Sequence, residues 1–541
     1  MKRLLPWVLL LIPIITFAQE DAWVFFADKE NVAESIANPI SILTQEAIDR
    51  KEMHGVVIDE RDVPVNESYI TQVKQQAGII VLAKSKWFNC VHVRGSQEAI
   101  DALGSLQFVD SIEFADDSLN SLTGSSDGFG FVKDDPQDTN GQQLVDYNYG
   151  ATENQVTMLS AEFLHQQDFT GAGMIVAVLD SGFPGVDTNA GFARVRDNGR
   201  LLDGYDFVDR VDDEFAFSNS SHGTRTASDI VGFIEDQFVG TAPDAFLYCF
   251  RTEDVNSENP VEESYWVEAA ERADSLGVDV INTSLGYRAY DNPAYSHTYE
   301  DMDGQTAFIS RGSNIAFEKG MLLVTSAGNS GTGMIAAPAD APGALTVGAV
   351  DSNGNYVSFS SIGPSSDGRV KPDVMAKGQN SAVITANGNV DTSSGTSFSS
   401  PIMAGAVTSL WQAFPERTNA EIMQFVRESA HLFNNPTAQM GYGIPNFEDA
   451  FNEVVLSVEE SAFAKAYTVS PNPANSIFQV QFPEGNSQAT VIVYDLLGKR
   501  VLTKEITNTN NSINVNTLTS GVYIIQIQDS ERSTTQKLIK Q

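Results

Sequence analysis

Ser397 is the residue whose surroundings most clearly predict chemistry. It ends the turn Gly395-Thr396-Ser397, and the segment after it should be helical. Such a turn exposes a serine hydroxyl at a helix N-terminus, where free backbone N–H groups and the helix dipole favour developing negative charge. Because a serine hydroxyl is barely nucleophilic at neutral pH, it needs a base to take its proton. The turn therefore predicts a nucleophile if a base and an acid are found elsewhere in the chain.

His222 and Asp180 are the candidates for the base and the acid. His222 is one of six histidines and is followed by Gly-Thr, and an imidazole titrates near working pH. Asp180 directly follows the apolar run 174–179. A carboxylate there adds nothing to packing, but it can hold the imidazole tautomer and stabilise the imidazolium. Each residue alone has a structural explanation, as a helix-capping serine, a core histidine or a turn aspartate. Together, in the order Asp, His, Ser, they predict a catalytic triad.

The order of the triad and its flanking residues resemble the subtilisin-like serine peptidases, the subtilase family. The resemblance covers about residues 151–455 and rests on the segments 176–182, 221–224 and 395–401. It implies that Asn329, in the segment 325–331, donates to the oxyanion together with the backbone N–H of Ser397. A turn-forming Asn-Ser-Gly without function is the alternative explanation of that segment.

The resemblance also implies where a substrate binds. The segment 284–286 is expected to pair with the substrate backbone as an added strand. The S1 pocket should lie between this segment and the segment 326–328. Ala336 and Ala337 are expected at the floor of this pocket. Neither segment contains Asp or Glu, so we expect an apolar rather than a basic P1 residue. The first segment is Ser284, Leu285 and Gly286, and the second is Ser326, Ala327 and Gly328.

The catalytic region alternates strand-like and helix-like segments, which predicts an α/β fold with a mainly parallel sheet flanked by helices. Continuous apolar runs are typical of strands that are buried on both faces. A helix is expected over 262–276, and strands are expected over 174–179, 245–250, 278–283, 321–326 and 345–350.

The composition limits the partners and cofactors. A formal net charge of −38 argues against binding to nucleic acid backbones or anionic membranes. The two cysteines, Cys90 and Cys249, fall in different predicted domains, so a disulfide between them is not expected. The chemistry needs no cofactor. Many subtilases hold structural calcium, but scattered aspartates have no fixed spacing like that of an EF-hand loop, so no ligands are assigned; these are Asp187, Asp203, Asp206, Asp212 and Asp213.

Residues 1–18 are typical of a secretory signal peptide, with Lys2 and Arg3 before a short apolar run. Residues 19–118 are expected to form a small α/β domain with helices at 39–51, 67–76 and 96–103. Its position before the catalytic region and the resemblance imply a propeptide that inhibits the enzyme and assists its folding. A retained binding module is the alternative. Residues 119–150 are rich in Ser, Gly, Asp and Asn, which predicts an exposed linker with a processing site.

Residues 467–541, after a polar linker at 456–466, form a last domain of strand-like runs at 478–482, 489–494, 513–515 and 522–527. Three pieces resemble the C-terminal sorting domain that the type IX secretion system reads: Ser470-Pro471-Asn472-Pro473, Tyr494-Asp495 with Gly498-Lys499, and Gly521-Val522-Tyr523. The resemblance implies export across both membranes. A β-sandwich accessory module is the alternative.

The sequence therefore predicts a secreted or cell-surface serine endopeptidase, made as a zymogen and without a transmembrane span. Its expected partners are protein or peptide substrates, its own propeptide and the type IX secretion machinery. The first alternative is a catalytically inactive subtilase-fold protein that binds partners at the surface. An adhesin, and an esterase or peptide ligase on the same fold, are the others.

Overall fold

The computed structural model describes residues 19–120, 147–482, 487–496, 498–529 and 533–541. It contains two compact units, Met1–Ala450 and Phe451–Gln541. The predicted signal peptide at 1–18 and most of the predicted processing linker at 119–150 lie outside the described residues.

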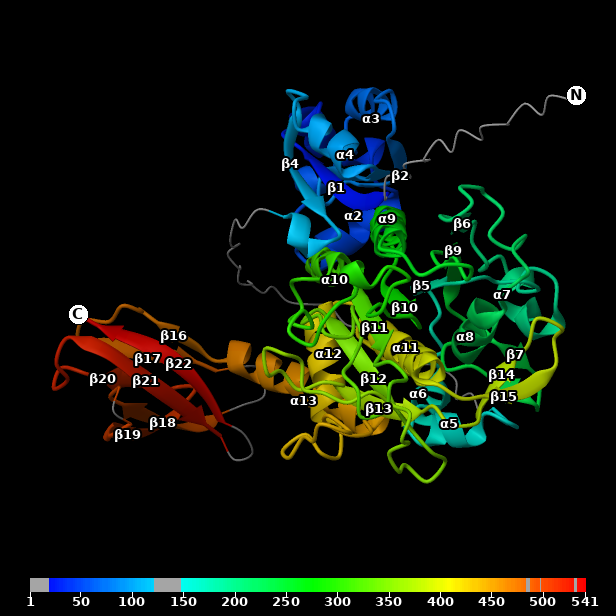
Figure 1. The fold of residues 1–541 in the computed structure, drawn as a ribbon. Coiled ribbons are helices and arrows are strands. Elements are labelled where there is room, and N and C mark those ends of the chain that lie inside the picture. Colours follow the sequence, from blue (N-terminus) through cyan, green and yellow to red (C-terminus); the bar gives the residue numbers. More distant parts are fainter. Residues whose placement is uncertain (1–18, 121–146, 483–486, 497, 530–532) are drawn as a thin grey trace, which may run out of the picture. The chain divides into compact units, whose positions relative to one another are not determined.

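Residues 19–120 form an N-terminal subdomain of the first unit (Figure 1). Its four-stranded sheet has the order β2-β3-β1-β4, and its antiparallel strands enclose a core with α3 and α4. The elements are β1 Glu20–Phe26, α1 Val32–Ala37, η1 Pro39–Ser41, α2 Gln45–Met53, η2 Glu60–Asp62, α3 Glu67–Lys74, β2 Ile80–Ser85, β3 Cys90–Gly95, α4 Gln97–Leu103, β4 Val109–Phe114 and η3 Asp117–Leu119.

The prediction of a helix over 39–51 is wrong for its first half. Pro39 opens a short 3₁₀ helix, and α2 begins only at Gln45. The physical reason is Thr44, whose side chain accepts a hydrogen bond from the backbone N–H of Ala47 at 3.2 Å. This N-cap fixes the start of α2 six residues after the predicted start.

Residues 147–450 form the rest of the first unit around a seven-stranded sheet of order β13-β12-β11-β10-β5-β9-β6. The strands that pair in it are parallel, as predicted. The strands of this region are β5 Ile175–Asp180, β6 Tyr205–Asp206, β7 Phe233–Ile234, β8 Phe238–Val239, β9 Phe246–Arg251, β10 Val280–Thr283, β11 Leu322–Ser326, β12 Ala344–Val350, β13 Val374–Lys377, β14 Ser381–Ile384 and β15 Val390–Ser393.

Helices cover the large sheet. Ala177, Leu179 and Ile281 belong to a buried cluster with residues of α9 and α10, whereas the alternating residues Val176 and Val178 are buried on the opposite face. α8 and α11 pack against each other, and α11 runs along β10 to β13. The helices are α5 Glu153–Thr157, α6 Glu162–Gln166, η4 Ala190–Phe192, α7 Ala193–Asp197, α8 His222–Val231, α9 Val261–Leu276, η5 Pro293–Tyr295, α10 Phe308–Glu318, α11 Thr396–Ala413, α12 Asn419–Glu428 and α13 Phe447–Ala466.

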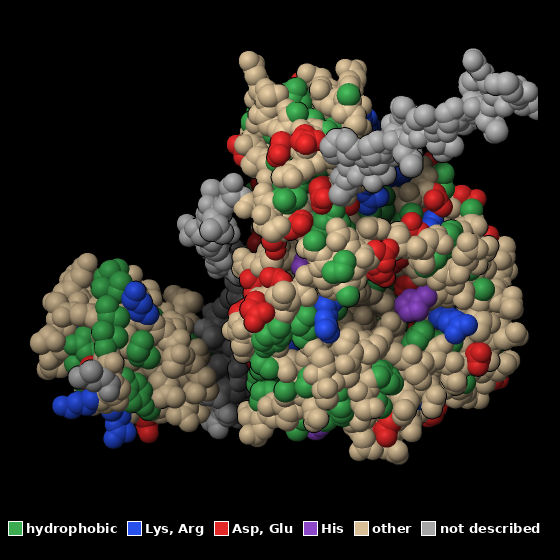
Figure 2. Space-filling model, in the orientation of Figure 1, with side chains coloured by type: hydrophobic (Ala, Val, Ile, Leu, Met, Phe, Trp, Pro, Cys, Tyr) green, Lys and Arg blue, Asp and Glu red, His purple; other side chains and the backbone are tan. Residues whose placement is uncertain are grey.

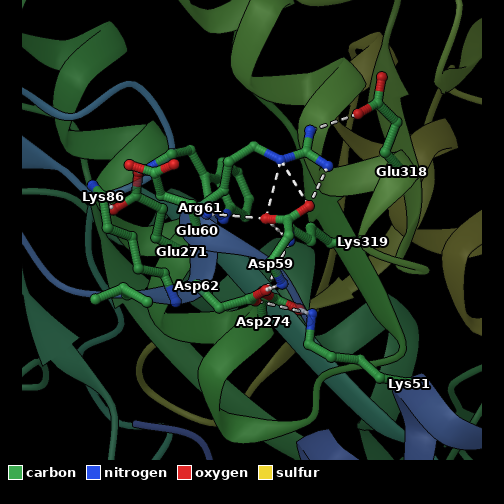
Figure 3. A network of polar contacts seen from close by, with 12 residues as sticks. Lys51, Asp59, Glu60, Arg61, Asp62, Lys86, Glu271, Asp274, Glu318 and Lys319 are labelled. Carbon is green, nitrogen blue, oxygen red and sulfur yellow. Dashed lines mark hydrogen bonds and ion pairs between the residues drawn. The ribbon is translucent and has the colours of Figure 1, made fainter. Parts of the chain in front are cut away.

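A buried ionic network joins the N-terminal subdomain to α9 and α10 (Figure 3). Lys51 Nζ lies 2.7 Å from the carboxylate of Asp274 and 3.3 Å from that of Asp62. Lys319 Nζ in turn lies 2.7 Å from Asp62. If the subdomain left, Asp274 would lose the cations of Arg50 and Lys51. Asp62 would keep Lys51 but lose Lys319, so neither side satisfies all of its buried charges alone.

Two further contacts bind the subdomain to α9 and α10. The Glu271 carboxylate of α9 accepts hydrogen bonds from the Ser85 hydroxyl and from the backbone N–H groups of Lys86 and Trp87, the latter two at 2.8 and 2.9 Å. The Trp23 ring stacks on Phe308 of α10 with centroids 4.7 Å apart. The interface therefore combines charged, polar and aromatic contacts.

The second unit holds two antiparallel sheets, of order β16-β17-β20 and β19-β18-β21-β22, around one apolar core. This is the sandwich-like fold that was predicted. The strands are β16 Thr468–Ser470, β17 Ile477–Gln481, β18 Gln488–Tyr494, β19 Arg500–Thr507, β20 Ser512–Asn514, β21 Gly521–Gln528 and β22 Ser533–Lys540. The stretch 456–466, treated as a linker from its polarity, lies inside α13. No helix in the described part of the chain is long and apolar enough to cross a membrane.

Candidate functional site

Asp180 and His222 meet at the carboxyl edge of the large sheet. Asp180 is the last residue of β5, and His222 is the first residue of α8. The Nδ1 atom of His222 lies 2.7 Å and 2.9 Å from the two Asp180 carboxylate oxygens. Since this pairing uses Nδ1, it leaves Nε2 of the imidazole available as a proton acceptor.

The surroundings of Asp180 hold its carboxylate in place. Asp180 is 1% exposed and accepts further hydrogen bonds from the Ser181 backbone N–H at 2.7 Å and from the Thr226 hydroxyl at 3.1 Å. Burial lowers the pKa of His222, but the charge of Asp180 and its hydrogen bond outweigh burial and raise the pKa above its usual range. The pair therefore stabilises an imidazolium.

Close packing brings α8 up to the end of β5. A Cβ atom on Gly223 would lie 2.6 Å from the backbone oxygen of Gly182. Real Cβ atoms do not approach a backbone oxygen so closely, so a larger residue after His222 would push the helix away. This explains why small residues flank the histidine.

Ser397 is the second residue of α11. Gly395, two residues before Ser397, has φ 151° and ψ 156°. This backbone region is open essentially to glycine alone. Ser397 is 8% exposed, and its hydroxyl donates to the Ser284 carbonyl oxygen at 3.1 Å. The ring of the next residue, Phe398, lies 5.7 Å from the His222 ring, so the N-terminus of α11 lies beside the histidine.

A chain of polar contacts fixes α11 to the end of β10. The Ser284 hydroxyl donates to the Ser397 backbone oxygen at 2.9 Å, and the Asn282 amide donates to the Ser284 hydroxyl at 3.0 Å. The Ser400 hydroxyl donates to the Asn282 amide oxygen at 2.9 Å. These three side chains are all buried, so Ser397 is held by groups that have little freedom to move.

Asn329 lies where an oxyanion donor is expected. Its amide oxygen accepts hydrogen bonds from the Thr396 backbone N–H at 2.9 Å and from the Thr396 hydroxyl at 3.1 Å. These bonds orient the amide so that its nitrogen, which has no acceptor among the described residues, is a free donor. The backbone N–H of Ser397 likewise has no acceptor in the described part of the chain.

The two segments predicted to bind substrate lie side by side at the ends of β10 and β11. The Ser326 hydroxyl is 3.5 Å from the Leu285 carbonyl oxygen, and a Cβ on Gly286 would lie 3.1 Å from the Cβ of Ala336. Gly328 has φ 103°, and a Cβ there would lie 2.9 Å from the Ser361 hydroxyl. Ala327 belongs to a small buried apolar cluster with Ile335 and Ala339. The structure thus brings together small and apolar residues at this site.

The aspartates before His222 do not gather into a calcium site. Asp206 instead pairs with the guanidinium of Arg251 at 2.7 Å. The described part of the chain contains no group of three or more His, Cys, Asp or Glu side chains that could hold a metal ion. The buried Arg251 also lies 3.5 Å from the centre of the Phe217 ring, and so braces the loop that leads to His222.

Glu253 and Tyr287 lie near Asp180 and were not predicted as site residues. Glu253 follows β9, and the preceding Thr252 donates its backbone N–H to the Asp180 carbonyl oxygen at 2.9 Å. The Tyr287 hydroxyl donates to Glu253 Oε1. Burial raises the pKa of the Glu253 carboxyl, and the charges of Glu258 and Asp180 raise it further. An acidic residue directly after a buried strand, as in the case of Asp180, was the signal that could have identified Glu253.

Comparison with known proteins agrees with this geometry. The model of the subtilase family matches residues 171–444. A peptidase S8 propeptide domain of the Bacteroidota matches residues 21–128, and a secretion system C-terminal sorting domain matches residues 468–541. The sorting domain indicates export to the cell surface or to the medium.

Several proteases are similar to the chain over long stretches. The alkaline protease of Alkalihalobacillus alcalophilus is 26% identical over 414 residues, which cover 76% of this chain and 94% of that protein. Subtilisin NAT of Bacillus subtilis subsp. natto is 31% identical over 300 residues, 54% of this chain and 70% of that protein. The crystal structure of MycP1 with its propeptide removed is 26% identical, with a TM-score of 0.45, over 55% of this chain and 96% of that one. The chain therefore belongs to the subtilase family and is a subtilisin-like serine peptidase with a propeptide domain and a type IX sorting domain.

Proposed function

We propose that the mature enzyme cleaves peptide bonds within proteins through an acyl-enzyme formed on Ser397, with His222 as the base, Asp180 as its partner and Asn329 as an oxyanion donor. The observation that carries the proposal is the 2.7 Å pair of Asp180 and His222 beside a serine at the N-terminus of α11. The buried Asp180, the free donor of Asn329 and the raised pKa of His222 all support it.

Acylation begins with the Ser397 hydroxyl. It turns from the Ser284 carbonyl toward Nε2 of His222, which takes the proton while Oγ forms a bond to the substrate carbonyl carbon. The carbonyl oxygen becomes an oxyanion, which accepts hydrogen bonds from the Asn329 amide nitrogen and the Ser397 backbone N–H. The C–N bond then breaks as the imidazolium gives its proton to the leaving amine.

Deacylation repeats these steps with water. His222 takes a proton from a water molecule, whose oxygen attacks the ester carbon, and the C–O bond to Ser397 breaks as Oγ regains a proton. During both steps, the 284–286 segment is proposed to pair with the substrate backbone, and Ser326, Ala327 and Gly328 are proposed to line a pocket for an apolar P1 side chain. Chemistry of this kind needs no cofactor.

The test is labelling of the processed protein with a fluorophosphonate probe, which reacts with activated serines. We expect labelling of the wild type and none of Ser397→Ala. Ser394→Ala, at an exposed serine of the same segment, is the matched control and should label like the wild type. A correctly folded, processed wild type that stays unlabelled would reject the triad and favour an inactive protein that binds partners. Turnover of a small ester but of no peptide would instead favour an esterase.

A further inference from the structure

Glu253 lies on the side of the catalytic centre that is opposite to the proposed P1 pocket. In the large sheet, β10 lies between β11 and β5, and β9 lies beyond β5. The proposed P1 pocket is at the end of β11, whereas Glu253 follows β9. The backbone bond from Thr252 to Asp180 and the bond from Tyr287 to Glu253 place this carboxylate between the ends of β5 and β10.

A substrate strand along 284–286 would present its side chains alternately to these two sides. Successive side chains of an extended chain point in opposite directions. If the P1 side chain, which belongs to the residue whose carbonyl reacts, enters the pocket beside β11, then the preceding P2 side chain points toward β5 and β9. On that side lie His222, whose side chain is 35% exposed, and the half-buried Glu253, whereas Asp180 is buried.

The Glu253 carboxyl group is available to a cation. Burial raises its pKa to about 8, so a cation that binds beside it would favour the ionised form. The Oε1 atom of Glu253 accepts from Tyr287, but Oε2 has no partner among the described residues and is not fully buried. No described lysine or arginine lies within ion-pair distance of it. Two arginines of this region are engaged elsewhere, since Arg251 pairs with Asp206 and Asp209 and Arg225 donates to Ser393. In Figure 2, acidic side chains adjoin a histidine at the edge of a hollow.

We propose that Glu253 is a specificity-determining residue that favours a lysine or arginine side chain at the P2 position of the substrate. This inference rests on the proposed function. A cationic P2 side chain would reach the free Oε2 atom and supply the counter-charge that the folded enzyme lacks there. Tyr287 would hold the carboxylate in place by its bond to Oε1. The enzyme would thus combine an apolar P1 pocket with an acidic P2 wall.

The test compares peptides that differ only at P2. Processed enzyme is assayed on fluorogenic peptides with one apolar P1 residue and with Lys, Gln, Leu or Glu at P2. We expect kcat/KM for the Lys peptide to exceed that for the uncharged Gln peptide by roughly tenfold, as for one partly buried ion pair, and the Glu peptide to be the poorest substrate. Glu253→Gln should bring the Lys/Gln ratio close to one.

Two variants separate recognition from a structural role. Glu235→Gln removes an exposed acid between β7 and β8 and should keep the wild-type ratio. Tyr287→Phe keeps the carboxylate, and its ratio should stay above that of Glu253→Gln. If Glu253→Gln lowered kcat/KM for all peptides by the same factor, or if the wild type did not distinguish Lys from Gln, the inference would be wrong although the enzyme labels with fluorophosphonate. If no peptide were cleaved and no label were incorporated, the triad assignment would fail, and this inference with it.

Discussion

The side-chain amide of Asn329 is oriented by Thr396, the residue directly before the proposed nucleophile. Thr396 donates to its oxygen through both the backbone and the hydroxyl, so the nitrogen that should hold the oxyanion moves with α11. Donor and nucleophile are thereby coupled through one residue. This arrangement favours stabilisation of charge that develops in the transition state over binding of the uncharged substrate.

Replacement of Asn329 by alanine should lower kcat by about 10²–10³ with little change in KM, a magnitude known from a member of this family. The physical reason is the loss of a donor that acts only on the oxyanion. Steady-state kinetics on a peptide would measure it. Thr396→Val removes the hydroxyl bond to the amide oxygen and the acceptor of the Gly328 backbone N–H, and it should have a smaller effect because the backbone bond to the amide oxygen remains. A rise of KM with constant kcat in Asn329→Ala would contradict the assignment.

The pH dependence of activity should follow the titration of His222. Its pKa is lowered by burial and by Arg225 but raised by Asp180 and Glu253, and the net direction is upward. Because the base must be neutral, activity is lost as pH falls through this raised pKa, so the acid limb of kcat/KM should lie above the usual histidine value of about 6.5. Arg225→Gln removes a charge that lowers the pKa and should move the limb to higher pH. An unmoved limb in that variant would show that Arg225 does not act on the imidazole.

At the scale of elements, Glu271 of α9 should make the binding of the propeptide subdomain depend on pH. Burial raises the pKa of its carboxyl to about 7, against an ordinary value of 4.5, although Lys86 and the bonds from Ser85 and Trp87 oppose this. When the subdomain leaves, the side chain should regain its ordinary pKa. The bound state therefore holds the proton more tightly, and this group's contribution to binding is present below about pH 4.5 and is lost as pH rises to about 7.

Release of the propeptide after processing should therefore become easier between about pH 5 and pH 7, by at most about tenfold in the binding constant per pH unit from this one group. The fraction of subdomain that co-elutes with the processed catalytic region, measured across this range, would show it. Other acids at the interface titrate too, so the informative comparison is with Glu271→Gln. That variant should have a flatter pH dependence than the wild type, and equal slopes would rule out Glu271 as the source.

The parallel strands could be predicted from the sequence because they follow local patterns, and the proposed triad rests on local patterns too. Strands β5 and β11 are largely apolar, and β10 begins with Val280 and Ile281. The proposed triad residues lie at the end of such a strand or at the start of a helix. Strands β19 and β22 were not predicted, because RVLTKEIT and STTQKLIK are rich in polar residues and are largely exposed. Glu253 and Tyr287 were missed for another reason. Their roles arise where the ends of β9 and β10 meet across β5, and spacing along the chain does not show that meeting.

At the scale of the whole molecule, the sorting domain and the catalytic region belong to separate compact units. Removal of residues 467–541 should therefore leave a protein that folds, matures and cleaves peptides, because each unit has its own apolar core. Peptidase activity and thermal unfolding of the truncated protein should match those of the catalytic region of the full chain. In the native host, the truncated protein should not leave the cell, whereas full-length Ser397→Ala should be exported. Loss of activity on truncation would show that the units depend on each other for folding.

The stacking of Trp23 on Phe308 has an optical consequence. Of the five tryptophans, Trp23 and Trp87 belong to the propeptide subdomain and are each 5% exposed, while Trp266 and Trp411 are fully buried in the catalytic region. Departure of the subdomain uncovers the first two. It also removes the His54 ring, which stacks on Trp411 with centroids 5.4 Å apart. Intrinsic emission should then shift to longer wavelength as zymogen dissociates, so the protein carries its own fluorescent reporter of activation, and the event can be followed in real time without a label or a substrate.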